Sequence, residues 1–387
     1  MKLSDFLLDR VKAIPPSAIR KNFDIINEMK DVISLGIGEP DFATPWDIIE
    51  SGVYSLEKGH THYSPNPGFK ELRYLISEYQ KKRYGLKYDP DSEIIVTVGA
   101  SEAIDVSLRS FVEVGDEVII PEPSFVCYKP LITITGATPV TIDLKSENNF
   151  KLMAKDLLSA ITDRTKVLIL SFPNNPTGAV MTKEDLEPIV NVLKDKDILV
   201  ISDEIYSELT YEGHHTSIAS FKEMKDKTIV INGFSKSFAM TGWRVGYVCG
   251  NCEFIEAMKK IHQYSIMCAP TVAQYAAIEA LKSNENNVTI MKTEYNRRRR
   301  VMVDGFNKIG LPCFEPLGAF YVFPSIKSTG LSSEDFSQRL LRETKVLVVQ
   351  GNAFGNCGEG FIRVTYSNSM ENIIEAMKRV KEFIEAL

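Results

Sequence analysis

Three apolar segments in the middle of the chain are each followed at once by polar side chains of reactive types. The motif FPNNPTG (172–178) offers asparagines, DEIY (203–206) an acid and a phenol, and SKSFAMTGWR (235–244) an amine and a guanidinium. Each residue alone has an ordinary interpretation as a cap, a solvated cation or half of a surface ion pair. Together, at the ends of strands of one sheet, they predict a single site.

This combination of side chains has one coherent chemical interpretation. A lysine can hold an aromatic cofactor as a Schiff base, a buried carboxylate can keep a pyridine nitrogen protonated, and an arginine can hold a phosphate. The segment GASEA (99–103) predicts a glycine turn into a helix, whose free N–H groups suit the same phosphate. Neither a GxGxxG motif nor a P-loop stands at a strand end, which argues against dinucleotides and nucleoside triphosphates.

Short β-branched runs alternate with helical patterns through this part of the chain, which indicates βαβ units and a mostly parallel sheet. Several runs are apolar at nearly every residue, as strands covered on both faces must be. We predict seven strands, at Glu93–Val98, Glu117–Pro121, Pro139–Asp143, Lys166–Ser171, Ile198–Ser202, Thr228–Asn232 and Arg244–Cys249. In open α/β sheets ligands lie beyond the carboxyl ends of the strands, where the three motifs stand.

Helices are expected between and after these strands. Thr182, with Asp185 three residues on, predicts a capping box that opens a helix to about Lys194. Helical spacing also marks residues 69–84, 101–112, 272 onward, 294 onward and 370–387. We expect an α/β architecture, with a large domain over residues 45–290 and a smaller α+β domain built from both ends of the chain, residues 1–44 and 291–387.

The composition restricts the classes of partner. The 45 basic and 51 acidic residues give a net charge of −6, which argues against nucleic acid and anionic membranes. No apolar run approaches the roughly 18 residues that span a bilayer, and the acidic start of the chain is unlike a secretory signal. The six scattered cysteines resemble neither a disulfide framework nor a zinc site, so we expect a cytoplasmic protein without a bound metal.

From about Ile14 to the C-terminus, the chain resembles the fold-type I class I aminotransferases, which depend on pyridoxal 5′-phosphate (PLP). The block SKSFAMTGWRVGY, preceded by PNNPTG and SDEIY, carries the resemblance. It implies a homodimer that moves an amino group between an L-amino acid and a 2-oxo acid by a ping-pong mechanism. A PLP-dependent carbon–sulfur β-lyase of the same fold stays open as the alternative, because the two chemistries share their first steps.

The resemblance implies roles for individual residues of this chain. Lys236 matches the lysine that binds the cofactor as a Schiff base, Asp203 the acid on the pyridine nitrogen, and Tyr206 the phenol on the ring oxygen. These three are the implied catalytic residues. Further implied cofactor contacts are Asn175 on the ring oxygen, Phe125 stacked on the ring and, around the phosphate, Ala100, Ser101, Ser235 and Arg244.

Further matches concern the substrate and a second subunit. Arg363, in FIRVTYS, matches the arginine that pairs with the α-carboxylate of the substrate. Asn175 and the backbone of Gly38 match groups that approach the same carboxylate. Tyr63, in THYSPNPG, matches the tyrosine that reaches the cofactor phosphate in the neighbouring subunit, so the resemblance implies two shared active sites.

The sequence departs from the family pattern at two positions. Gly233 stands where some relatives have a hydroxyl group on the phosphate, so Ser235, Arg244 and the glycine turn must provide more of the phosphate binding. Ser101 stands where aspartate-specific members often have a lysine that contacts the distal carboxylate. A neutral hydroxyl does not offset the desolvation of a second carboxylate as a cation does. We therefore expect aromatic or large apolar amino acids to be at least as good donors as aspartate.

Overall fold

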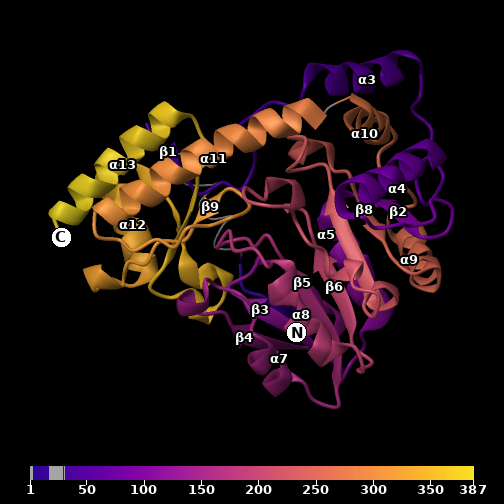
Figure 1. Ribbon diagram of the computed structural model, residues 1–387, viewed down its shortest axis with the longest axis horizontal. Coiled ribbons are helices and arrows are strands. Elements are labelled where there is room, and N and C mark those ends of the chain that lie inside the picture. Colours follow the sequence, from indigo (N-terminus) through magenta and orange to yellow (C-terminus); the bar gives the residue numbers. More distant parts are fainter. Residues whose placement is uncertain (1–2, 17–28, 30, 284) are drawn as a thin grey trace.

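The computed structural model describes residues 3–16, 29, 31–283 and 285–387 (Figure 1). Residues 1–2, 17–28 and 30, from the expected small-domain segment 1–44, and residue 284 lie outside the described residues. At the centre is a seven-stranded sheet with the strand order β2-β8-β7-β6-β5-β3-β4. Its strands are β2 (Ile94–Thr97), β3 (Glu117–Glu122), β4 (Thr138–Asp143), β5 (Thr165–Ser171), β6 (Leu199–Asp203), β7 (Thr228–Gly233) and β8 (Gly246–Cys249).

The seven predicted strands are confirmed, and no end differs from the prediction by more than two residues. Neighbouring strands are parallel except around β8, which is antiparallel to both β2 and β7. The carboxyl ends of β5, β6 and β7 therefore lie at one edge of the sheet, together with the amino end of β8. Asp203 is the last residue of β6, while Lys236 and Arg244 belong to the connection from β7 to β8.

Helices cover both faces of the sheet, because successive side chains of each strand point into two different apolar layers. Ile231 of β7 packs in one layer and its neighbour Val230 in the other. The helices of the first layer are α5 (Gly99–Phe111), α6 (Tyr128–Thr135) and α9 (Cys252–Ser265), and those of the second are α4 (Lys70–Tyr84), α7 (Ala154–Ala160), α8 (Lys183–Leu193) and α10 (Thr271–Ser283). Coverage on both faces explains why the strand sequences are apolar almost throughout.

The helix expectations are confirmed, with one difference in extent. The Thr182 hydroxyl accepts from the Asp185 N–H and the Asp185 carboxylate accepts from the Thr182 N–H, which completes the predicted capping box of α8. Helix α11 (Glu285–Lys308) begins well before Glu294, where the apolar pattern predicted its start. Residues 285–287 are polar and exposed, whereas Val288 and Met291 are buried at helical spacing with Tyr295, so the apolar pattern of this helix begins at Val288.

The C-terminal third forms a second core beside the large sheet. β11 (Val349–Gln350), β12 (Ile362–Thr365) and β9 (Tyr321–Val322) make an antiparallel sheet, and β1 (Ile33–Ser34) pairs with β10 (Val346–Leu347). Helices α12 (Ser333–Thr344), α13 (Met370–Glu385) and part of α11 pack on this region (Figure 1). The β1–β10 pair brings residues from both ends of the chain together. In the described part of the chain, no helix combines the length and apolar character needed to cross a membrane.

Candidate active site

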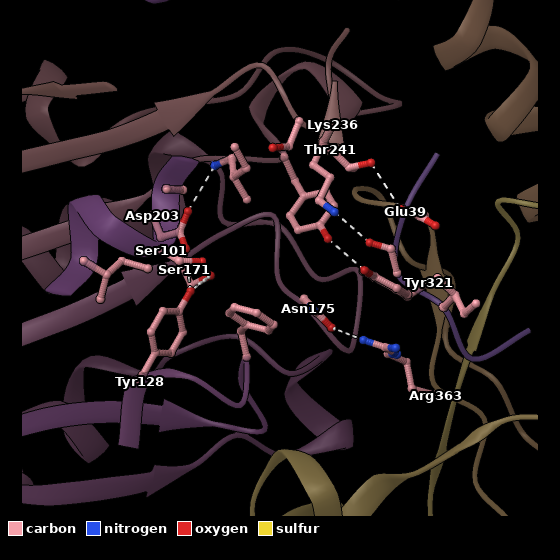
Figure 2. A pocket seen from close by; sticks show the side chains of 18 of the residues that line it. Glu39, Ser101, Tyr128, Ser171, Asn175, Asp203, Lys236, Thr241, Tyr321 and Arg363 are labelled. Atoms are coloured by element: carbon pink, nitrogen blue, oxygen red, sulfur yellow. Dashed lines mark hydrogen bonds between the residues drawn. The ribbon is translucent and has the colours of Figure 1, made fainter. Parts of the chain in front are cut away.

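A cavity of about 310 Å³ lies at the edge of the large sheet where β5, β6 and β7 end (Figure 2). Except for Tyr63, every residue that the sequence analysis assigned to the site lines this cavity. These residues are Gly38, Ala100, Ser101, Phe125, Asn175, Asp203, Tyr206, Ser235, Lys236, Arg244 and Arg363. The structure thus brings together residues from seven separate parts of the chain, and the three strand-end motifs are among them.

Lys236 stands in the wall of the cavity, three residues after the end of β7. Its Nζ donates to the carbonyl oxygen of Gly38 at 2.6 Å and lies over the rings of Tyr206 and Phe320, 5.8 and 5.7 Å from their centroids. Burial lowers the pKa of Lys236 to about 8. With this pKa, about a tenth of the molecules carry a neutral lysine at pH 7, far more than with the ordinary lysine value, and a nucleophile or a base must be neutral.

Asp203 is buried at the end of β6 and faces the same cavity. Its Oδ2 accepts from the Tyr128 hydroxyl at 2.7 Å, and its Oδ1 accepts from the Ile205 N–H at 3.2 Å. Burial raises the pKa of Asp203, while these two hydrogen bonds act in the opposite direction. Among the described residues, no cation is in hydrogen-bond contact with this buried carboxylate, which therefore suits a ligand that carries a positive charge, such as a protonated pyridine nitrogen.

The start of α5 forms a cradle for an anion. Gly99 opens the helix with a φ of +73°, the preceding Val98 provides no side-chain cap, and Ala100 and Ser101 of the first turn line the cavity. The positive φ favours glycine at this position, and a Cβ atom there would also lie 2.7 Å from Nη2 of Arg244. Arg244 and Ser235 line the cavity beside this helix end. Helix N–H groups, a guanidinium and a hydroxyl together suit a phosphate.

Arg363 projects into the cavity from β12 and is almost fully buried. Its Nη1 donates to Oδ1 of Asn175 at 2.9 Å (Figure 2), and its Nη2 donates to the carbonyl oxygen of Gly36 at 2.6 Å. Nε is buried and has no hydrogen-bond partner among the described residues. A buried cation with a free N–H favours an anionic ligand such as a carboxylate.

The structure adds two tyrosines that the sequence analysis did not assign to the site. Tyr128 donates its one hydroxyl proton to Asp203, and its hydroxyl oxygen lies 3.0 Å from Oγ of Ser171, whose hydroxyl can donate to it. The hydroxyl of Tyr321 lies 2.7 Å from the hydroxyl of Tyr206 and fills the space beside Gly38, where a Cβ atom would collide with it. Tyr128 follows Phe125 by three residues in PEPSFVCY, but nothing in the spacing of either tyrosine marks it as a site residue.

Tyr63 lies outside this cavity. Its side chain is 81% exposed and lines a separate surface hollow with His60, His62 and Ile266. Within one chain the structure does not bring Tyr63 to the other site residues, so its role in a neighbouring subunit stays a prediction.

Comparisons with known proteins agree with this geometry. The family described as aminotransferase class I and II matches residues 30–380. A putative aminotransferase of Bacillus subtilis (strain 168), YugH, is 50% identical over 99% of each chain, and an aspartate aminotransferase of Pyrococcus abyssi is 47% identical over 97% of each. The crystal structure of an aromatic aminotransferase from Pyrococcus horikoshii OT3 is 45% identical, with a TM-score of 0.90 over 94% of this chain and 99% of that one. The chain therefore belongs to the class I and II aminotransferase family and is a PLP-dependent transaminase.

Proposed function

We propose that this transaminase takes the amino group of neutral L-amino acids, aromatic ones included, and passes it to a 2-oxo acid. The observation that carries the proposal is the distribution of cations in the cavity. Lys236, Arg244 and Arg363 are the lysines and arginines among its described lining residues, and each has a role toward the cofactor or the α-carboxylate. None is left for a second carboxylate on the side chain of the substrate.

The residues around the cavity are suited to hold PLP, and we assign them as follows. Asp203 pairs with the ring nitrogen, Tyr206 and Asn175 donate to the ring oxygen, and Phe125 stacks on the ring. The phosphate binds to the N–H groups of Ala100 and Ser101 and to the side chains of Ser235 and Arg244. Buried Asp203, the uncapped start of α5 and the position of Arg244 support these assignments.

The remaining residues orient the substrate and move one proton. When bound, PLP supplies an electron-poor ring that accepts the electron pair released when the Cα–H bond breaks. In our proposal, Arg363 binds the α-carboxylate with its free Nε–H and so fixes the direction of that bond. Nζ of Lys236 takes the proton from Cα and, later in the same half-reaction, would deliver it to the cofactor rather than back to Cα. The carbonyl oxygen of Gly38 is 2.6 Å from Nζ and can orient the amine.

Ser101 is the residue that we expect to disfavour acidic side chains. It is the third residue of α5, within the anion cradle, and it lines the cavity. The similar proteins include both an aspartate and an aromatic aminotransferase, so their names do not decide between these substrates. The free-energy cost of desolvating an unpaired second carboxylate favours neutral amino acids over aspartate.

Replacing Ser101 with lysine is expected to raise kcat/KM for aspartate by about 10- to 100-fold, because one charge-assisted pair contributes about 1.5–3 kcal/mol. The kcat/KM values for tyrosine and phenylalanine should change by about twofold or less, since their rings form no such charge-assisted pair. Steady-state kinetics with each donor and one 2-oxo acid measure both. Ser101→Ala is the matched control and should leave the ratio of aspartate to tyrosine near that of the wild type.

A wild-type enzyme that prefers aspartate over every neutral amino acid by a large factor would contradict this proposal. It would mean that a cation from elsewhere reads the side chain. The same panel of amino acids, tested without a 2-oxo acid, addresses the lyase alternative. Release of ammonia and pyruvate from a cysteine conjugate under those conditions would indicate β-elimination, whereas transamination needs the acceptor.

A homodimer with shared active sites is part of the proposal. Large apolar side chains are exposed on the two segments that line the hollow beside Tyr63, among them Tyr63, Tyr264 and Met267, which are 81%, 88% and 47% exposed. Exposed apolar groups of this size favour contact with another protein surface. A second copy of the chain on this surface would bring Tyr63 to the phosphate of its partner.

Mixing two impaired variants tests the sharing of sites. Lys236→Ala and Tyr63→Ala subunits should each form weakly active dimers. After random exchange, half of the dimers are mixed and one site in each carries both wild-type residues, so about one quarter of wild-type activity is expected. Activity that stays at the mean of the two separate variants after proven subunit exchange would exclude a role for Tyr63 across the interface.

Two broader assignments complete the proposal. We assign the large domain to residues 45–290 and the small domain to residues 1–44 and 291–387, which is supported by the β1–β10 pair between the two ends of the chain. We place the enzyme in the cytoplasm, which is supported by six cysteines that are all free thiols.

A further inference from the structure

A buried histidine links the anion cradle to the loop that carries Tyr63. His262 lies in the last turn of α9 and is fully buried. Its Nδ1 is 2.6 Å from Oε1 of Glu102, and its Nε2 is 3.0 Å from the carbonyl oxygen of Asn66. Neither Glu102 nor His262 is among the residues that line the cavity, so the link acts from behind the site.

The chemistry of the two partners fixes how His262 bonds to them. A carbonyl oxygen only accepts, so Nε2 must carry a proton and donate it to Asn66. The contact between Nδ1 and the carboxylate oxygen needs a second proton, which the imidazole and Glu102 share. His262 therefore holds both neighbours at once through two directional bonds, and no apolar side chain of similar size can replace them.

Glu102 fixes the turn that we assign to the cofactor phosphate. It belongs to the first turn of α5 and directly follows Ser101. Its second oxygen, Oε2, accepts from the N–H of Val98, which precedes the helix. One carboxylate thus bonds to the backbone before Gly99 and to a buried side chain of another helix. The position of the uncapped N–H groups depends on where Glu102 is held.

Asn66 lies in the Tyr63 loop, which we define as residues 60–69. Its side chain donates to the carbonyl oxygen of Met267 at 3.0 Å. Gln274, fully buried on α10, also holds the loop, since it donates to Oγ of Ser64 at 2.7 Å and accepts from the N–H of Phe69 at 2.9 Å. The loop is therefore anchored at several points, and His262 connects this fixed loop to α5.

We propose that His262 is a positioning residue for the cofactor phosphate. By bonding to Glu102 and Asn66 together, it sets the first turn of α5 against the Tyr63 loop and keeps the N–H groups of Ala100 and Ser101 aimed at the phosphate. The inference rests on the phosphate site proposed above. It predicts that losing His262 weakens binding of the phosphate group specifically and leaves the ring and the amine site intact.

The test compares PLP with pyridoxal, which has the same ring and aldehyde but no phosphate. The probes are added to the full-length protein after its cofactor has been removed by dialysis, and absorbance gives the two Kd values. In His262→Leu, the Kd for PLP should rise about tenfold or more, while the Kd for pyridoxal should change by about twofold or less. At saturating PLP, kcat should stay within about threefold of the wild type, because Lys236 and Arg363 are untouched.

Gln80→Leu is the matched control. Gln80 is fully buried in α4 and donates to the hydroxyl of Tyr247 in β8 at 2.9 Å. This variant therefore also loses a buried hydrogen bond, between a helix and the large sheet. It should lower Tm to a similar degree without changing the ratio of the two Kd values. Glu102→Gln serves as the second variant if His262→Leu does not fold, and it should show a smaller loss of the same kind.

The outcomes separate this inference from the proposed function. If the wild type binds pyridoxal and PLP equally well, the phosphate site itself is wrong. If the wild type prefers PLP, but a folded His262→Leu or Glu102→Gln variant loses affinity for both ligands equally or for neither, then His262 contributes only to stability and the inference is overturned.

Discussion

Replacing Lys236 with alanine is expected to lower kcat by about 10⁴-fold or more, because it removes both a covalent anchor and a proton-transfer group. The fold should be retained, since Nζ contributes one hydrogen bond, to Gly38, and faces a cavity rather than a packed core. Steady-state kinetics with the best amino acid donor measure the loss. Reduction with borohydride, followed by peptide mapping, locates the lysine that carries the cofactor in the wild type.

Lys227→Ala is the control for this experiment. Lys227 also has a lowered pKa, caused by burial, but its Nζ donates to the carbonyl oxygens of Leu193 and Lys196, away from the cavity. Activity should survive this change.

Because a neutral amine is the nucleophile and the pKa of Lys236 is about 8, PLP should bind the cofactor-free wild type faster as the pH rises from about 7 to about 9. A cofactor label on any other lysine would overturn the assignment.

Replacing Asp203 with asparagine is expected to lower kcat by about 10²- to 10³-fold, the loss typical when one preorganised electrostatic partner is removed from a buried site. The amide has nearly the same size and can still accept from Tyr128, so packing should be preserved. It does not carry the charge that stabilises a protonated ring nitrogen. Kinetics and the Kd for PLP, measured on the same preparation, distinguish a loss of rate from a loss of binding.

Tyr128→Phe is the graded companion to Asp203→Asn. It removes the 2.7 Å hydrogen bond to Asp203 but leaves the carboxylate in place. We expect a loss of about tenfold in kcat, in line with one hydrogen bond to a charged group. If Asp203→Asn stayed within about threefold of the wild type, Asp203 would be only a residue that ends β6, and the proposed pairing with the ring nitrogen would fail.

Strand positions and most of the cavity could be predicted from the sequence for one physical reason. A strand buried on both faces must be apolar almost throughout, so a polar residue at its end is conspicuous, as Asp203 is after β6. Because parallel strands end at the same edge, residues marked in this way also lie near one another. Arg363 has no such signal from spacing, and only the resemblance to a family predicted its role.

Other parts of the site depend on contacts that no local pattern encodes. Tyr321 reaches Tyr206 from β9, more than a hundred residues away in the sequence. His262 looks like an ordinary helix residue in the sequence, and its importance arises from Glu102 and Asn66, which lie 160 and 196 residues earlier. The early start of α11 has a partial signal, because its first turn is polar and solvated but Val288, Met291 and Tyr295 follow at helical spacing.

The antiparallel strand β8 also bears on the order in which the site assembles as the chain folds. β7 ends at Gly233 and β8 begins at Gly246, so pairing these strands closes only the short loop of residues 234–245, at a small cost in conformational entropy. Lys236 and Arg244 therefore reach their places with a local hairpin. Arg363 must meet Gly36 across 327 residues, and contacts of such high sequence separation form slowly. During folding, Lys236 and Arg244 can therefore reach their positions before Arg363 reaches the position from which it can bind a carboxylate.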